Sequence, residues 1–300
     1  MRSNRFAARL APGAPPLLLD GAMGTALQVM GLAPTDLPEA WLLARPEAIG
    51  EVHRAHVAAG ARLLLTCTFN AAAPRAAGLL GGGLVRRACL AAAALARLEA
   101  DGADGVLVAG ALGPRALARP GGPVPPEAEL ARPFLPALQA LVEGGVDLLW
   151  LETQYDQREA LAALRVAVPL GLPVVLTYAL HARDGRLLAA DGTPAEALLR
   201  EAAAAGAAAA GVNCAPAGPA LTALTRWAAS ELLVPFVAKP SPGLPGAVLP
   251  PAPFADAVAP AIEAGARLVG GCCGATAEHV AALARRMDRG RAPWSSPRGG

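Results

Sequence analysis

The chain has 300 residues, of which 54% are hydrophobic and 17% are charged, and its formal net charge is +2. This length and apolar content allow a substantial core, and they fit one large barrel as well as two ordinary domains. Because the charge is nearly balanced and no basic run is interleaved with aromatic residues, nothing marks a nucleic-acid surface or a polybasic membrane anchor, so we expect small-molecule partners.

The cysteine content indicates a reducing compartment. The five cysteines are an odd number, two of them are adjacent, and they do not resemble a disulfide framework. The first sixteen residues are interrupted by Pro12, Pro15 and Pro16 before any apolar signal sequence could form. The longest run of small residues, 201–212, has too little bulk and length to span a bilayer. We therefore expect a cytoplasmic protein with no transmembrane segment.

Short β-rich apolar runs alternate with longer helical stretches along nearly the whole chain, which is typical of βα units around a parallel sheet. We expect a loose arm over residues 1–16, one barrel over residues 17–288 and a disordered tail over residues 289–300. Eight strands are predicted at residues 17–20, 62–66, 105–110, 148–152, 173–178, 208–213, 235–239 and 268–271. The clearest helices are predicted at residues 46–59, 84–99, 157–168, 194–205 and 277–287.

Eight such units predict an α/β fold of the (β/α)8 TIM-barrel type. An open doubly wound sheet is disfavoured because no G-x-G-x-x-G motif follows an early strand. Two proline-rich stretches, residues 115–126 and 240–253, begin just after predicted strands. We expect them to form the longer loops over the barrel mouth.

Chemically unusual residues end many of these strands. Active sites of TIM barrels lie at the carboxyl ends of the strands, so a functional side chain should end a strand or begin the next loop. The residues that meet this condition are Asp20, Thr66, Cys67, Thr68, Glu152, Asn213, Cys214, Lys239, Cys272 and Cys273.

Three of the cysteines are placed to share a metal ion. Cys214 follows the sixth predicted strand, and Cys272 and Cys273 follow the eighth, between glycines in residues 270–274. In a closed barrel these strand ends face one mouth, and the glycines allow a sharp turn that points both adjacent thiols inward. Three thiolates with one open position suit a catalytic Zn²⁺ site, because soft sulfur ligands select zinc and the open position accepts substrate.

Other interpretations of the cysteines stay open. Buried cysteines are common in apolar cores, although a vicinal pair with a third thiol at strand ends favours a metal. Cys67 could instead supply a fourth sulfur and close a structural zinc site, although such sites usually use C-x2-C knuckles. Cys89 falls within a predicted helix and is expected to pack there. His53 and His56 are expected to be surface polar residues on an outer helix.

A three-thiolate site suits the activation of a thiol better than the activation of water. A substrate thiol in the open position would lose its proton to the metal yet stay electron-rich among the other thiolates. Such a sulfur is a nucleophile at neutral pH, ready for in-line attack on an activated methyl group.

Asp20 and Glu152 are candidates for recognising an amino-acid substrate. Either carboxylate could pair with its ammonium group, and backbone N–H groups near Gly21 could receive its carboxylate. A helix cap or an internal ion pair is the alternative interpretation of each acid.

Six segments occur in the order seen in the homocysteine S-methyltransferase family, which the chain resembles from about residue 17 to residue 287. The segments are residues 20–25, 66–71, 110–114, 152–153, 211–214 and 270–274. The combination of Asn-Cys with Gly-Gly-Cys-Cys-Gly is highly specific. The resemblance implies zinc held by Cys214, Cys272 and Cys273, and homocysteine bound through its amine by Asp20 and Glu152. It also implies Thr68 as a further substrate contact.

The resemblance leaves the methyl donor open among S-methylmethionine, S-adenosylmethionine, betaine and methylcobalamin. Cys67 and the loop of residues 239–245 depart from the pattern of the methionine synthase module, and both flank the mouth. Methylcobalamin or methyltetrahydrofolate, if used, would come from a separate chain. One alternative is therefore a stand-alone subunit that presents homocysteine to a corrinoid protein. Another is a Schiff-base aldolase that uses Lys239, the sole lysine.

Overall fold

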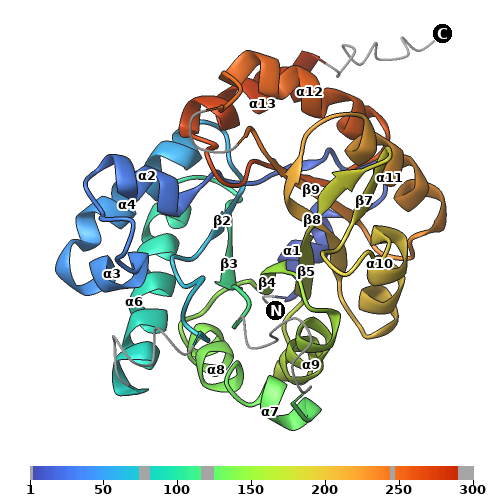
Figure 1. Cartoon of the computed structure of the whole chain (residues 1–300). Helices are drawn as coiled ribbons and strands as arrows, with labels where there is room; N and C mark the ends of the chain where they lie inside the picture. Colours follow the sequence, from blue (N-terminus) through green and yellow to red (C-terminus); the bar gives the residue numbers. More distant parts are fainter. Residues whose placement is uncertain (1–2, 74–81, 116–124, 244–246, 290–300) are drawn as a thin grey trace, which may run out of the picture.

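The computed structural model describes residues 3–73, 82–115, 125–243 and 247–289. Eight parallel strands follow one another around a sheet in the order β1-β10-β9-β8-β5-β4-β3-β2, and a bridge between Leu19 and Leu63 joins the two end strands. The sheet is thus closed, and the predicted (β/α)8 barrel is confirmed (Figure 1). The strands are β1 (Leu17–Leu18), β2 (Leu63–Leu65), β3 (Leu107–Leu112), β4 (Leu148–Gln154), β5 (Val174–Ala179), β8 (Ala209–Pro216), β9 (Phe236–Ser241) and β10 (Leu268–Val269).

The strands are nearly all apolar because both of their faces are buried. Successive side chains alternate between the barrel interior and the helical layer. Leu63 and Leu65 belong to the interior cluster, whereas Leu64 between them packs in the larger cluster toward the helices. Trp150 fills the interior and donates a hydrogen bond from its indole Nε1 to Thr177 Oγ1 over 3.1 Å. The interior is therefore a packed core rather than a pore.

Helices cover the outside of the barrel (Figure 1). The five helices expected from the sequence are confirmed as α4 (Pro46–Ala58), α6 (Gly82–Asp101), α9 (Gln157–Ala167), α10 (Ala195–Ala204) and α13 (Ala277–Arg289). Further helical segments are α2 (Met23–Val29), η1 (Pro38–Ala40), α3 (Trp41–Ala44), α7 (Glu127–Ala131), α8 (Leu135–Glu143), η2 (Val168–Leu170), α11 (Pro219–Glu231) and α12 (Pro251–Glu263). A small antiparallel hairpin of β6 (His181–Arg183) and β7 (Arg186–Leu188) follows β5. None of the described helices is long and apolar enough to cross a bilayer.

The two proline-rich stretches are only partly described. Residues 116–124 and 244–246 lie outside the described residues, as does the predicted tail from residue 290 onward. Residues 251–253, expected to be loop, instead form the start of α12. Proline is well tolerated in the first helical turn because its missing N–H would have no helical acceptor there.

The N-terminal segment is not the loose arm expected from its prolines. Residues Ser3–Arg9 form the helix α1. Phe6 is 2% exposed and packs into the barrel interior, and Arg5 forms a 3.0 Å ion pair with the buried carboxylate of Asp147. Prolines at positions 12, 15 and 16 do not prevent the preceding residues from packing against the barrel.

The prediction of surface positions for His53 and His56 was wrong. Both side chains are buried, on the inner face of α4. They continue a helical stripe with Ile49 and Val52, which is the spacing of a core-facing surface. Burial lowers the pKa of His53 to about 3 and that of His56 to about 4, so both rings are neutral at pH 7.

Candidate active site

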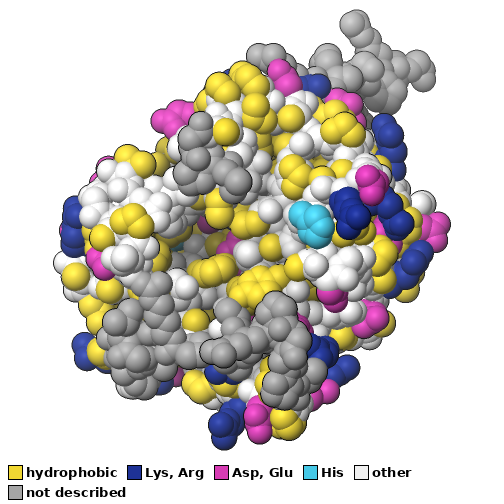
Figure 2. Space-filling model, in the orientation of Figure 1, with side chains coloured by type: hydrophobic (Ala, Val, Ile, Leu, Met, Phe, Trp, Pro, Cys, Tyr) yellow, Lys and Arg dark blue, Asp and Glu magenta, His cyan; other side chains and the backbone are white. Residues whose placement is uncertain are grey.

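A cavity of about 250 Å³ opens at the carboxyl ends of the strands. Figure 2 shows this hollow near the centre of the face, with acidic side-chain atoms visible inside it. Most of the residues that end the strands line the cavity, as the barrel argument requires. Its lining includes Asp20, Gly21, Met23, Pro38, Glu39, Thr66, Cys67, Phe69, Asn70, Glu152, Thr153, Cys214, Lys239, Cys272 and Cys273.

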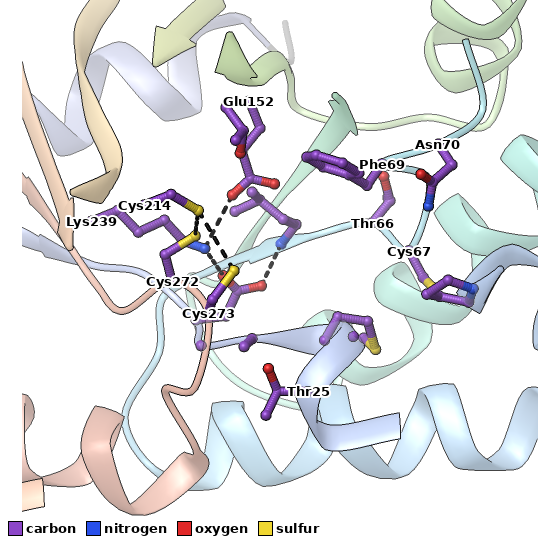
Figure 3. A pocket seen from close by; sticks show the side chains of 18 of the residues that line it. Thr25, Thr66, Cys67, Phe69, Asn70, Glu152, Cys214, Lys239, Cys272 and Cys273 are labelled. Carbon is purple, nitrogen blue, oxygen red and sulfur yellow. Dashed lines mark hydrogen bonds and ion pairs between the residues drawn. The ribbon is translucent and has the colours of Figure 1, made fainter. Parts of the chain in front are cut away.

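The three predicted metal ligands meet on one side of this cavity (Figure 3). The Sγ atom of Cys214 lies 2.8 Å from that of Cys272 and 3.6 Å from that of Cys273, and all three sulfurs lie within 4.8 Å of one another. Sulfurs around a tetrahedral zinc ion, at about 2.3 Å from the metal, are separated by roughly 3.8 Å. The Cys214–Cys273 separation is close to this value and the Cys214–Cys272 separation is shorter, so the three soft donors are near enough to one another to share a zinc ion.

Local backbone geometry brings the sulfurs together. Cys214 has a left-handed backbone with φ of 49°, at the point where the pairing of β8 with β9 shifts register. Behind the vicinal pair, a Cβ added to Gly271 would lie 2.3 Å from the Cβ of Ala275, and Gly274 has φ of 84°. Glycine is thus needed at both positions for the tight turn, as the sequence indicated.

The sulfur contacts favour ionisation of Cys273. Hydrogen bonds with Cys214 and Cys272 lower the pKa of Cys273 to about 3, whereas hydrogen bonds with Cys272 and Cys273 raise the pKa of Cys214. At neutral pH the cluster therefore holds a thiolate, the form in which cysteine binds metals.

Beside the thiols lies a buried group of three charges. Lys239 places its Nζ atom 3.3 Å from Glu152 Oε1 and 3.7 Å from Asp20 Oδ1. Burial opposes the charge on Lys239, but the two carboxylates outweigh it and raise its pKa, so Lys239 stays an ammonium ion. A Schiff-base lysine must reach its neutral form, so this environment disfavours the aldolase alternative.

The two acids keep binding capacity despite this ion pairing. Asp20 Oδ2 accepts the N–H of Leu65 over 2.7 Å, whereas no donor among the described residues forms a hydrogen bond with Oδ1. Burial raises the pKa of Asp20 to about 7, against the opposing effect of Lys239, and burial also raises the pKa of Glu152. The internal ion pair considered for these acids thus exists, and Asp20 Oδ1 takes part in it at 3.7 Å without receiving a hydrogen bond from the described residues.

Gly21 and Thr68 are placed differently from one another. Gly21 lines the cavity, and a Cβ at this position would lie 2.5 Å from the carbonyl oxygen of Ala275. Thr68 is fully buried and does not line the cavity. Its hydroxyl donates to the carbonyl of Ala111 over 2.7 Å and contacts the hydroxyl of Thr66 at 2.6 Å. Thr68 therefore links the end of β2 to β3, and of these two threonines Thr66 lines the cavity.

The remaining cysteines stay apart from the cluster. Cys67 lies on the opposite side of the cavity in Figure 3 and is not in the three-cysteine group. Burial raises its pKa well above the ordinary value. Cys89 is fully buried in the helical layer, as predicted, and burial raises its pKa to about 12. The closed four-sulfur site with Cys67 is therefore not supported.

Met23 and Glu39 line the cavity but were not identified from the sequence. Glu39 is fully buried, and its carboxylate accepts hydrogen bonds from the backbone N–H of Asn70 over 2.6 Å and from the Asn70 side chain. Both residues belong to helical segments inserted between β1 and α4, so the rule that functional residues end strands could not find them.

The chain resembles known proteins along most of its length. Residues 17–287 match the family model described as homocysteine S-methyltransferase. A curated homocysteine S-methyltransferase from Escherichia coli K12 is 33% identical, and the match covers 90% of this chain and 94% of that relative.

Solved structures also resemble this chain along most of its length. The metallated form of the homocysteine methyltransferase MmuM from Escherichia coli superposes with a TM-score of 0.80 at 28% identity, covering 94% of this chain and all (100%) of that one. Its oxidised form gives a TM-score of 0.78 at 30% identity, covering 90% and 96% of the two chains. A methyltransferase from Methanosarcina mazei, 14% identical with a TM-score of 0.62 and covering 97% and 99%, shares the fold.

Proposed function

Because the chain belongs to the homocysteine S-methyltransferase family, we propose that it methylates the sulfur of homocysteine to form methionine, in a site where Cys214, Cys272 and Cys273 hold Zn²⁺. The observation that carries this proposal is the convergence of three thiols beside two buried carboxylates in one cavity. When bound, zinc supplies a Lewis acid that lowers the pKa of a coordinated thiol, so that a sulfur nucleophile forms at neutral pH.

The carboxylates would orient the amino acid. Asp20 Oδ1, buried and without a hydrogen-bond donor, is the natural acceptor for the substrate ammonium, together with Glu152. Gly21 lies on the cavity wall next to Asp20, where its backbone N–H would receive the substrate carboxylate. Thr68 would act indirectly by fixing the end of β2 against β3. This arrangement holds the side-chain sulfur of homocysteine toward the cysteines.

Lys239 would keep the charge of the site in balance. Two carboxylates and at least one thiolate share a buried space with this single cation. An ammonium ion at this position lowers the electrostatic cost of bringing a further thiolate into the cavity. We assign Lys239 this counter-ion role and no covalent chemistry.

The methyl donor would enter from the side of the cavity opposite the cysteines, where Phe69 and Asn70 lie (Figure 3). In-line transfer requires the methyl group to point at the substrate sulfur from that direction. S-methylmethionine, S-adenosylmethionine and betaine would be used directly, whereas methylcobalamin or methyltetrahydrofolate would be supplied through a separate chain. Because reactive thiols need reducing conditions, we propose that the protein acts in the cytoplasm.

A donor screen tests this function. The zinc-loaded protein is incubated with homocysteine and each donor in turn, and methionine is quantified by mass spectrometry. We expect methionine with at least one small-molecule donor. Turnover only after addition of methylcobalamin would favour the subunit alternative, and no methionine under any condition would contradict the proposal.

A further inference from the structure

Asn213 connects the thiol cluster to the strand that carries Glu152. Its side chain is fully buried at the end of β8, beside the end of β4. The Oδ1 atom accepts the backbone N–H of Thr153 over 2.9 Å, and Nδ2 lies 2.6 Å from Thr153 Oγ1. Nδ2 also lies 3.4 Å from Cys272 Sγ and 3.6 Å from Cys214 Sγ.

The orientation of this amide follows from its partners. A backbone N–H only donates, so the atom that faces the N–H of Thr153 must be the carbonyl oxygen. The amide nitrogen of Asn213 is then directed to the hydroxyl of Thr153 and to the two sulfurs. Its two hydrogens are sufficient for one bond to oxygen and one shared between the sulfurs of Cys214 and Cys272.

The third cysteine differs from the other two in its contacts with the Asn213 amide. Cys273 is exposed to the cavity, and its Sγ atom contacts Cys214 but receives no bond from the Asn213 amide within the described part of the chain. An N–H···S hydrogen bond withdraws electron density from a thiolate, so it makes the sulfur a weaker nucleophile. The cluster therefore contains two sulfurs that Asn213 makes less reactive and one that it does not.

This difference between the cysteine sulfurs affects which of them could react with an activated methyl group. If the proposed function holds, a methyl donor faces the sulfurs of three cysteines as well as the sulfur of its substrate. We propose that Asn213 is a positioning residue that directs methylation to the substrate, because its amide lowers the nucleophilicity of Cys214 and Cys272. The same amide fixes the strained ends of both strands, where Thr153 has φ of 58° and Cys214 has φ of 49°.

The proposal can be tested without turnover of homocysteine. Zinc-loaded protein is treated with methyl iodide, which forms an S–CH3 bond on cysteine and releases iodide, and each cysteine is quantified by peptide mass spectrometry. Asn213→Asp keeps the size of the side chain and the acceptor for Thr153 but removes the N–H donor. Thr153→Val is the matched control, because it removes the other partner of the amide and leaves the donor to the sulfurs.

We expect Asn213→Asp to raise methylation of Cys214 and Cys272, relative to Cys273 in the same molecule, by about tenfold. Thr153→Val should keep the wild-type distribution. An unchanged distribution in Asn213→Asp, or an equal change in Thr153→Val, would overturn the proposal. If the wild-type protein makes no methionine but shows the expected distribution, the proposed function fails while the role of Asn213 stands.

A second measurement covers the case in which the Asn213 variant does not retain metal. In wild-type protein loaded with ¹¹³Cd, an N–H···S bond to a ligating cysteine gives a through-bond correlation between the metal and the amide proton. We expect such a correlation to the side-chain protons of Asn213. Its absence would contradict the proposed bond.

Discussion

Each end of the barrel contains a buried aspartate, and the two aspartates differ in how completely they are hydrogen-bonded. At the amino end, Asp147 accepts hydrogen bonds from Val108 N–H at 2.8 Å, from Arg97 at 2.7 Å and from Arg5 at 3.0 Å. At the mouth, Asp20 has one firm bond, from Leu65, and an oxygen without a hydrogen-bond donor. A fully paired buried charge serves stability, whereas an incompletely paired one is kept where a ligand completes it.

The amino and carboxyl ends of the barrel also differ in side-chain packing and in backbone geometry. Phe6 closes the amino end as part of the interior cluster, whereas the carboxyl end is left open as a cavity. Two of the non-glycine residues with positive φ, Thr153 and Cys214, lie at the mouth. The mouth therefore carries two strained residues and the incompletely paired Asp20, whereas the amino end carries the docked Phe6 and the fully hydrogen-bonded Asp147.

The largest effect should come from removing a sulfur at the mouth. Cys272→Ala should lose stoichiometric zinc and reduce kcat/KM at least about 10³-fold, because several kcal/mol of thiol activation depend on the metal. Zinc is measured by elemental analysis, and circular dichroism should report an intact barrel. Cys89→Ala, which removes a thiol far from the cavity, should retain zinc. Zinc binding by Cys272→Ala at wild-type affinity would contradict the assigned ligand set.

The amino end should respond in stability and not in catalysis. Phe6→Ala should lower the free energy of unfolding by about 3 kcal/mol, because it removes a large side chain from the interior. Urea denaturation measures this loss, and KM for homocysteine should be unchanged in buffer without urea. A marked rise in KM would mean that the two ends of the barrel are not independent.

Substrate recognition at the mouth should be weaker when one acid is neutralised. Glu152→Gln should raise KM for homocysteine about 10- to 100-fold, since a hydrogen bond to a charged group contributes roughly 1.5–3 kcal/mol. The comparison substrate is 4-mercaptobutyrate, which lacks the amine. Equal losses with the two thiols would show that Glu152 does not bind the ammonium group.

The smallest effect concerns the buried histidines between the barrel and α4. Since burial lowers the pKa of His53 to about 3 and that of His56 to about 4, from 6.5, the unfolded chain binds more protons than the folded one below pH 6.5. The contribution of these two histidines to stability should therefore fall as pH decreases from about 6.5 toward 4, by up to about 1.4 kcal/mol per pH unit for each histidine.

His53→Leu isolates one of these contributions. Neither ring nitrogen of His53 has a hydrogen-bond partner among the described residues, so leucine removes the titration without breaking a bond. Urea denaturation at pH 6.5 and pH 5.0 should show a smaller acid-induced loss in the variant than in the wild type. Equal losses would refute the assigned effect of burial.

Local patterns predicted most of the barrel. The eight strands and five helices were recognisable because apolar strands and amphipathic helices alternate with distinct periods. The short helices between β1 and α4 were not, because segments of three to seven residues carry too little periodicity. Phe6 was missed for a different reason, since its burial depends on where the barrel opening lies in space.

The sequence by itself determined which residues end the strands, because hydrophobic period and glycine placement are local properties. It thereby identified Cys214, Cys272 and Cys273 as a group, and Asp20, Glu152 and Lys239 as residues of the mouth. Only the tertiary structure decided that Lys239 lies between the two acids, that Thr68 bonds to the carbonyl of Ala111 and that Asn213 reaches the sulfurs. Those contacts join strands separated by tens of residues, and their geometry arises only when the barrel closes.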